Sequence, residues 1–227
     1  MKSLFITGTD TDVGKTYIAA GLAITLRKMG MDVGIMKPFA AGIAQKKGFQ
    51  SEDVEILSNA AQINDPESLV NPQFFPISAS PYTAWKKLKI KPKISLILSS
   101  FKKLAKIHEV MIVEGMGGTM TPILKDYYVA NLIKDMKLST VIVTRSRIGT
   151  VNHTLMTVMM CKKYNIPIKG IIINNFDDGY PIDQLKKDLE NLTGIKVLGS
   201  IPFIKDMSDD SLHRIFKKNV DMKLLLK

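Results

Sequence analysis

The sequence contains very little cysteine: Cys161 is the only one among 227 residues. An intrachain disulfide is therefore excluded, and a reducing, cytoplasmic setting is expected. Cys161 lies in a Met-rich run that is predicted to be helical, so we interpret it as a core residue rather than a nucleophile.

Long hydrophobic runs are also lacking. Runs such as 141–143 and 171–173 are far shorter than the ~20 residues that a membrane-spanning helix needs. The N-terminus has no charged region followed by an apolar segment and a cleavage site, so no signal peptide is expected. We predict one large domain over residues 1–227, on the basis of a usual domain length of ~100–200 residues.

Acidic residues are scarce relative to basic ones. The chain has 21 Asp and Glu against 32 Lys and Arg, which gives a net charge of +11. The lysines are scattered in pairs rather than gathered in one block, and few aromatic residues lie among them. We therefore interpret the excess charge as a solvated surface, and predict neither a nucleic-acid partner nor a membrane partner.

What the sequence does contain is a phosphate-loop pattern near its N-terminus. An apolar run at 3–6 leads into GTDTDVGKT at 8–16, and an apolar, helix-compatible run at 17–29 follows. This order of strand, Gly-bounded loop and helix is typical of nucleotide-binding proteins. Backbone N–H groups would hold the phosphates, Lys15 would add a positive charge, and the Thr16 hydroxyl would bind Mg²⁺.

The loop departs from the usual spacing. Five residues rather than four separate Gly8 from Gly14, so either Thr9 takes the first-glycine position or the loop is one residue longer. Asp12 inside the loop is also unusual, because an acid repels phosphates. We interpret it as a residue that orients an amine or a lysine.

The rest of the chain alternates between apolar strands and amphipathic helices. Continuously apolar strands are buried on both faces, and their alternation with helices indicates a parallel sheet. We predict an α/β fold, a three-layer sandwich with a mostly parallel central sheet flanked by helices, of the phosphate-loop NTPase type. The remaining predicted strands are 32–36, 110–113, 140–143, 168–173 and 197–201, and the remaining helices are 51–60, 82–88, 94–107, 128–136, 151–163, 182–192 and 211–226, with irregular chain at 39–48 and 64–81.

Polar or glycine-rich segments follow most of these strands. In a parallel sheet, ligands bind at the carboxyl ends of the strands, so these segments predict the position of the site. They are the loop at 8–16, Lys37-Pro38, 114–118, 144–149, Asn174-Asn175 and 202–204.

Glu114 directly follows an apolar strand, where a carboxylate is costly to bury unless it is paired or bound to a cation. We favour Mg²⁺ as that cation, and the alternative is an ion pair with Lys15 or Lys37. Mg²⁺ prefers few carboxylates together with phosphate oxygens and water. One acid from the segment 52–55, with Thr16 and Glu114, would make a suitable set.

Lys37 ends the second predicted strand. A second lysine beside Lys15 would stabilise the charge that develops on a transferred phosphoryl group. The glycines of 115–118 would let a ligand approach the backbone closely, and the N–H of Met116 remains available between them.

Eight segments together carry a resemblance to a known family. They are GTDTDVGKT at 8–16, KPFAAG at 37–42, the helix start at Asp53, SPYTA at 80–84, VEGMGG at 113–118, IGTVNHTLMT at 148–157, IINN at 172–175 and GSIPF at 199–203. On these segments the chain resembles the dethiobiotin synthetase family over nearly its whole length. The loop lacks the additional early lysine of the membrane-cycling and DNA-partitioning ATPases. The chain departs from the family at Ala41, where a serine is usual, and at Met116, where a small residue is usual.

The resemblance implies an enzyme of biotin biosynthesis. In that reaction 7,8-diaminononanoate, CO₂ and ATP give dethiobiotin, ADP and phosphate, with Mg²⁺ as the cofactor. A carbamate of the substrate attacks the γ-phosphate, and the second amine then closes the ureido ring. The resemblance also implies a cytoplasmic homodimer with its site near the subunit interface.

Residue roles are implied in the same way. Lys15, Lys37 and Thr11 match catalytic positions, and Thr16, Asp53 and Glu114 match the Mg²⁺ ligands. The implied ATP-binding positions are Asp12, Val13, Gly14, Lys15, Thr16, Tyr17, Asp53, Glu114, Gly115, Met116, Gly117, Asn174, Asn175, Pro202, Phe203 and Ile204. The implied substrate-binding positions are Thr11, Lys37, Ala41, Gly118 and Asn152, the last supplied by the other subunit.

A nucleotide-dependent switch that binds a membrane or a protein partner is the alternative function. Its support is the segment 211–227, where apolar residues at near-helical spacing lie among Lys217, Lys218 and Lys223. We favour instead a terminal helix packed on the sheet. A related amidoligase acting on cobyrinate-like acids is disfavoured, because such enzymes carry a glutaminase domain for which this chain has no room.

Overall fold

A parallel sheet forms the centre of the molecule. The computed structural model describes residues 3–175 and 180–227. The strands of the central sheet are β1 (Leu4–Gly8), β2 (Val33–Met36), β5 (Val110–Gly118), β8 (Ser139–Arg145), β9 (Ile168–Asn175) and β10 (Val197–Pro202). They pair in parallel in the order β10-β9-β8-β1-β5-β2.

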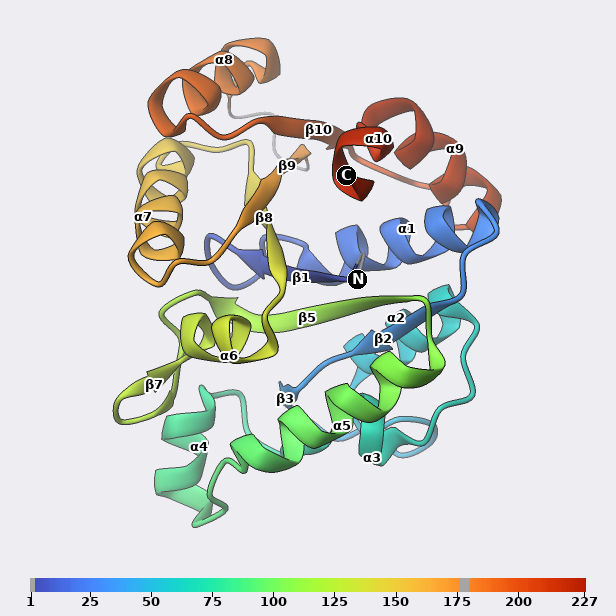
Figure 1. Ribbon diagram of the computed structural model, residues 1–227, viewed down its shortest axis with the longest axis vertical. Coiled ribbons are helices and arrows are strands. Elements are labelled where there is room, and N and C mark those ends of the chain that lie inside the picture. Colours follow the sequence, from blue (N-terminus) through green and yellow to red (C-terminus); the bar gives the residue numbers. More distant parts are fainter. Residues whose placement is uncertain (1–2, 176–179) are drawn as a thin grey trace.

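Helices cover both faces of this sheet (Figure 1). One face packs against α1 (Lys15–Lys28), α2 (Glu52–Ala61), α9 (Asp209–Asn219) and α10 (Met222–Leu226). The other packs against α4 (Pro81–Leu88), α5 (Ile94–Ile107), α6 (Val129–Met136), α7 (Thr150–Lys163) and α8 (Ile182–Thr193). The predicted three-layer α/β fold is confirmed.

The two faces explain why the strands read as continuous apolar runs. Side chains alternate between the faces of a strand. In β1, Leu4 and Ile6 belong to the core under α1, whereas Phe5 belongs to the core under α6. Both positions must therefore be apolar, as the sequence pattern indicated.

Five short elements escaped the sequence prediction: β3 (Phe39–Ala41), α3 (Glu67–Val70), β4 (Gln73–Phe75), β6 (Pro122–Leu124) and β7 (Tyr127–Tyr128). The prediction of irregular chain at 39–48 and 64–81 is therefore wrong in part. β3 pairs with β4 over three positions, and a strand of that length carries no readable periodicity. The third predicted strand was also too short, because β5 continues through Glu114 to Gly118.

The prediction of one continuous C-terminal helix over 211–226 is wrong. Helix α9 ends at Asn219, Val220 bridges Gly199, and the Asp221 side chain accepts a hydrogen bond from the Leu224 N–H to start α10. The Phe216 ring is buried so close to α1 that a Cβ on Gly21 would lie 2.2 Å from it. The apolar side of this tail is thus used inside the molecule, which is the packed arrangement that we favoured.

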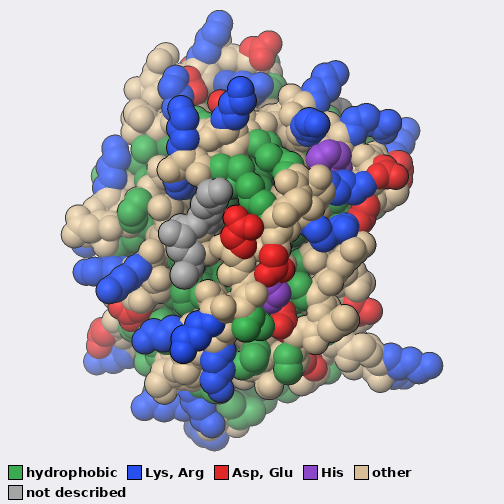
Figure 2. All heavy atoms as spheres, turned by 45° about the vertical axis from the view of Figure 1, so that its right-hand side comes forward, with side chains coloured by type: hydrophobic (Ala, Val, Ile, Leu, Met, Phe, Trp, Pro, Cys, Tyr) green, Lys and Arg blue, Asp and Glu red, His purple; other side chains and the backbone are tan. Residues whose placement is uncertain are grey.

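On the face shown in Figure 2, the positive charge is not gathered in one basic block. Figure 2 shows Lys and Arg side chains spread over the face in view, as the scattered lysine pairs of the sequence predicted. No helix within the described residues is both long enough and apolar enough to cross a membrane.

His108 joins three parts of the chain at the edge where β2 and β5 begin. Its Nδ1 lies 3.0 Å from Asp32 Oδ1, and its Nε2 lies 2.8 Å from Asp65 Oδ2. Burial lowers the pKa of His108, but hydrogen bonds and charges from the two carboxylates outweigh burial and raise it overall. The folded state therefore favours the imidazolium.

We predict that this bridge makes stability depend on pH. Above the ordinary histidine pKa of 6.5, the unfolded chain loses the proton while the folded chain keeps it. The contribution of the bridge to the unfolding free energy is therefore full below pH ~6.5 and is lost as the pH rises through the raised pKa, with a slope of at most ~1.4 kcal/mol per pH unit. Urea unfolding between pH 6 and pH 8.5 (~0.5-unit steps) measures this slope.

The matched variant is His108→Gln, which stays polar but takes up no proton. Its unfolding free energy should fall less with pH over this range than that of the unsubstituted chain. Identical pH slopes for the two proteins would contradict the role given to the bridge.

Candidate active site

Two cavities lie at the carboxyl ends of the central strands. The larger, of about 840 Å³, is lined by residues of the phosphate loop and of four further segments: Thr11, Asp12, Gly14, Lys15, Thr16, Tyr17, Lys37, Ala41, Glu52, Asp53, Ile56, Ser78, Ala79, Ser80, Glu114, Gly115, Met116, Gly117, Thr121 and Pro122. The smaller, of about 240 Å³, is lined by Tyr17, Ile18, Asn174, Ile201, Pro202, Phe203, Ile204, Met207, Leu212 and Phe216. The larger cavity is polar and charged, and the smaller is mainly apolar.

The phosphate loop runs from the end of β1 to the start of α1. A Cβ on Gly8 would lie 2.7 Å from Val13 Cγ2 and 2.9 Å from the Asp10 carbonyl oxygen, so the loop requires glycine there. The Thr9 N–H instead continues the sheet pattern by donating to the Val143 carbonyl at 2.9 Å. Of the two interpretations of the spacing, the longer loop that starts from Gly8 is the observed one.

The loop delivers the chain into α1 through Gly14, whose φ of +87° suits glycine. Gly14 has no side chain that could cap the helix. The N–H groups of the first turn of α1 are therefore left to bind an anion. Asp12 also has a positive φ, of 56°, and its carbonyl accepts from Arg145 Nη1 at 3.2 Å. Gly14 and Asp12 both line the larger cavity, so this part of the backbone lies at its wall.

Lys15 is buried against its own loop. Its Nζ donates to the Asp10 carbonyl at 2.9 Å. Burial lowers the pKa of Lys15, and the negative charges of Glu114 and Asp53 offset this only in part. A bound anion would favour the charged form of Lys15 and so raise its pKa again. The loop is therefore electrostatically suited to bind phosphate.

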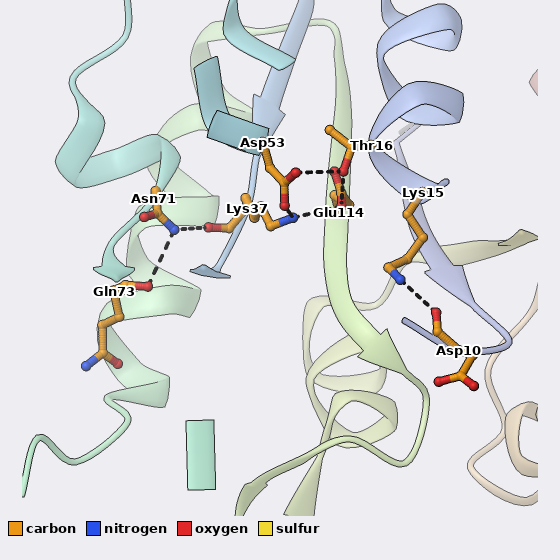
Figure 3. Close-up of polar contacts among 8 residues, drawn as sticks. All are labelled: Asp10, Lys15, Thr16, Lys37, Asp53, Asn71, Gln73 and Glu114. Atoms are coloured by element: carbon orange, nitrogen blue, oxygen red, sulfur yellow. Dashed lines mark hydrogen bonds and ion pairs between the residues drawn. The ribbon is translucent and has the colours of Figure 1, made fainter. Parts of the chain in front are cut away.

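Lys37, Glu114, Asp53 and Thr16 form a cluster at the wall of the larger cavity (Figure 3). Lys37 Nζ forms an ion pair with Asp53 and lies 2.8 Å from Glu114 Oε1. Thr16 Oγ1 lies 2.9 Å from Glu114 Oε1 and 3.2 Å from Asp53 Oδ1. Burial lowers the pKa of Lys37, but the two carboxylates outweigh burial and raise it, so the lysine is charged.

The donor set of this cluster fits Mg²⁺. Glu114 Oε2 is buried and has no hydrogen-bond partner within the described part of the chain. The described residues contain no group of three His, Cys, Asp or Glu able to hold a metal ion by themselves. Two carboxylates and the Thr16 hydroxyl are what Mg²⁺ needs when phosphate oxygens and water complete its coordination. The observed ion pair is the one with Lys37, and the second carboxylate oxygen of Glu114 has no partner among the described residues.

Comparison with known proteins identifies the family. A family model described as "AAA domain" matches residues 2–211. A protein of Nitrosopumilus maritimus named ATP-dependent dethiobiotin synthetase BioD is 76% identical over 228 residues, covering 100% of both chains. The chain belongs to the dethiobiotin synthetase family. Relatives of the same name from Bacillus licheniformis and Bacillus subtilis strain 168 are 37% and 34% identical, cover 100% of this chain, and are themselves covered to 96% and 98%.

Solved structures support the fold of this dethiobiotin synthetase family member. A ParA family ATPase from Chlorobium tepidum superposes with a TM-score of 0.56 at 19% identity, covering 100% of this chain and 98% of that one. A chain of the MinC:MinD cell division protein complex from Aquifex aeolicus gives a TM-score of 0.57 at 13% identity, covering 99% of this chain and 93% of that one. At these identities the likeness establishes the shared fold alone.

Most of the positions implied by the family resemblance surround the two cavities. Four of the implied ATP-binding positions, Asn174 and 202–204, line the smaller cavity. Asn174 Nδ2 also donates to the Val13 carbonyl at 3.1 Å, which ties the smaller cavity to the phosphate loop. Val13 itself is buried behind the loop.

Besides Val13, three further positions lie outside the walls of the two cavities. Asn175 Oδ1 accepts from Ser146 Oγ at 2.7 Å, and Gly118 pairs with Gly8 in the sheet. Asn152 is exposed on α7. Only Asn152 was expected to act from another subunit.

Sequence reasoning missed one wall of the larger cavity. It consists of Ser78, Ala79 and Ser80, which follow β4, and of Thr121 and Pro122 at β6. The SPYTA segment of the family resemblance was the available signal for the first group. These residues place several hydroxyl groups on the wall of the cavity that Ala41 also lines, where the family usually has a serine.

We predict that Gly14→Ala lowers the affinity for ATP tenfold or more, about 1.4 kcal/mol. The new Cβ would lie 2.1 Å from Asn174 Nδ2, so the loop and the smaller cavity would both be displaced. Calorimetric titration with ATP measures the change. The matched control is Gly30→Ala, which has the same φ of +87° but nothing within 4 Å of the new Cβ. Both variants should have a lower free energy of unfolding, because alanine is strained at this φ. Equal ATP affinities of the Gly14→Ala and Gly30→Ala variants would contradict the prediction.

Proposed function

We propose that the chain catalyses the ATP-dependent formation of dethiobiotin from 7,8-diaminononanoate and CO₂, a step of biotin biosynthesis. The observation that carries the proposal is the convergence of Lys15, Lys37, Asp53 and Glu114 on one cavity, in a chain 76% identical to a relative named for that product. Cytoplasm is the compartment that we propose, because ATP is supplied there and the unpaired Cys161 stays reduced.

The proposed reaction has three steps. One amine of the substrate attacks CO₂ and gives a carbamate. A carbamate oxygen then attacks the γ-phosphorus of ATP, the bond to ADP breaks, and a carbamic–phosphoric anhydride forms. The second amine attacks the carbonyl carbon of that anhydride, phosphate leaves, and the ureido ring closes. Little covalent chemistry falls to the protein, so positioning and electrostatic stabilisation must provide most of the rate enhancement.

The residues of the larger cavity suit these tasks. Lys15 and the N–H groups of the first turn of α1 would hold the phosphates. Lys37 would stabilise the charge on the phosphoryl group during transfer. Thr11 and Asp12 line the cavity beside the loop, where they would contact the diamine as well as ATP.

We also propose Mg²⁺ as the cofactor, held by Thr16, Asp53 and Glu114. When bound, the ion would neutralise part of the phosphate charge and orient the terminal phosphates. The buried, unpartnered Glu114 Oε2 supports this assignment, since no other described residue satisfies it. With the carboxylates engaged in this way, Lys37 would be free to turn toward the transferred phosphoryl group.

A homodimer completes the proposal, with each chain acting as one domain. Asn152 lies on an exposed side of α7 together with Met156 and Met159, and Ile148 just before the helix is 87% exposed. Exposed apolar side chains in one patch are typical of a protein interface. A second copy of the chain on this side of α7 would bring Asn152 to the partner's cavity.

Phosphate release by the pure protein tests the function. We expect release with Mg-ATP and bicarbonate to rise at least about tenfold when the diamine is added, because the carbamate is the nucleophile that breaks ATP. Mass spectrometry should identify dethiobiotin in the same reaction. Diamine-independent hydrolysis, together with nucleotide-dependent binding to anionic vesicles, would instead favour the switch.

Lys37→Met supplies the internal control for this assay. It should lower kcat by about 10²–10³-fold while changing the affinity for ATP much less, since its charge is needed in the transition state. Lys47→Met removes an exposed lysine and should leave both quantities unchanged. An effect of Lys37→Met confined to ATP affinity would assign Lys37 to binding alone.

A further inference from the structure

Lys37 reaches the cavity from a backbone that other residues hold in place. It lies between β2, which ends at Met36, and β3, which begins at Phe39. Its N–H donates to the Val70 carbonyl at 2.8 Å, and its carbonyl accepts from Asn71 Nδ2 at 2.6 Å. Both of these hydrogen bonds go to residues that follow one another at the end of α3.

The Asn71 side chain is directed at Lys37 and away from solvent. It is 5% exposed and lines neither cavity. In Figure 3 its amide nitrogen points at the Lys37 carbonyl. Its Nδ2 also lies 3.5 Å from the Gln73 carbonyl, so both acceptors of the amide N–H₂ group are backbone oxygens. Asn71 Oδ1 is buried and, among the described residues, accepts no hydrogen bond.

The two ends of the Asn71 amide therefore act differently: the unpartnered oxygen lowers stability, and the nitrogen holds the Lys37 backbone in position. The unpartnered Oδ1 costs free energy, whereas the N–H₂ group satisfies the buried Lys37 carbonyl, which an apolar side chain at this position would leave without this donor. The hydrogen bond from the N–H₂ group fixes the peptide group that follows the Cα of Lys37, and thereby the position from which the Lys37 side chain extends. Pro38 restricts the same backbone from the other side, because a residue before proline is limited to extended conformations.

We propose that Asn71 is a positioning residue for the reaction, which acts on the phosphoryl group through Lys37 without contacting any substrate. This inference rests on the proposed function of Lys37. A displacement of about 1 Å in a group that stabilises the transition state costs up to about 10²-fold in rate. Loss of the Asn71 donor should therefore lower turnover and leave nucleotide binding nearly intact.

The chain offers a matched control two residues away. Gln73 is also a buried amide, 8% exposed, in the same segment. Its side chain accepts from the Lys93 N–H at 2.5 Å and donates to the Lys91 carbonyl at 3.2 Å. In Figure 3 the Gln73 side chain points away from Lys37. Replacing it disturbs the same segment without touching Lys37.

The test compares Asn71→Asp with Gln73→Glu in the diamine-dependent phosphate-release assay. Each change keeps the shape of the side chain and replaces its donor by an acceptor. Asn71→Asp should lower kcat by about 10–100-fold and change the KM for ATP by less than about threefold. Gln73→Glu should leave kcat within about threefold. Asn71→Leu and Gln73→Leu repeat the comparison without a new charge, and circular dichroism selects a temperature at which the compared proteins are folded.

A Lys37→Met background gives the second readout. There, adding the Asn71→Asp substitution should leave single-turnover phosphate release unchanged, because a residue that acts through Lys37 has no effect without it. The inference is overturned if Asn71→Asp and Asn71→Leu keep normal kcat, if the Gln73 variants lose as much, or if the losses from Lys37 and Asn71 simply add. Absence of diamine-dependent release in the unsubstituted chain would instead overturn the proposed function itself.

Discussion

The ion pair between Lys37 and Glu114 is the interaction on which the site depends. Lys37 is 5% exposed and Glu114 is 1% exposed, and their charged atoms lie 2.8 Å apart. A buried charge without a partner costs several kcal/mol, so Glu114 requires Lys37 in place, whereas Lys37 is stabilised by both Glu114 and Asp53. Because Lys37 follows β2 and Glu114 lies within β5, the pairing of these neighbouring strands in the sheet is what brings the two charges together.

The same pair organises its surroundings. Asp53 at the start of α2 contacts the ammonium group, and Thr16 at the start of α1 donates to the carboxylates. Four segments far apart in the sequence therefore meet where a cation and phosphates would bind. By pairing with both carboxylates, the lysine keeps these segments together, and Asn71 keeps the lysine within reach of the cavity.

Much of this could be predicted from the sequence, for a physical reason. Long strands and helices repeat an apolar pattern over many residues, and parallel strands must end at a common edge, so Lys37, Glu114 and Asn174 were expected beside the phosphate loop. Short elements such as β4 and β6 carry too few residues for a pattern, and Ser80 and Thr121, which adjoin them, were missed as cavity residues.

Other features depend on contacts that no spacing reveals. The loop spacing left Gly8 and Thr9 as alternatives, and the choice rests on Val13, whose Cγ2 would lie 2.7 Å from a Cβ placed on Gly8. The C-terminal segment has an amphipathic pattern that suits a membrane surface or a protein core equally well, and only the contact of Phe216 with Gly21 decides between them. The contact of Asn71 with Lys37 joins residues 34 positions apart, in a stretch without periodicity.

A double-mutant cycle on the free energy of unfolding tests the central interaction most directly. Lys37→Met, Glu114→Gln and the double variant would be unfolded in urea without nucleotide or Mg²⁺. Lys37→Met should lose about 3–5 kcal/mol, because it leaves the buried Glu114 carboxylate without a cation. Glu114→Gln should lose less, because Asp53 still pairs with Lys37. The double variant should lose clearly less than the sum of the two. Losses that add within about 0.5 kcal/mol would contradict the view that this pair holds the site together.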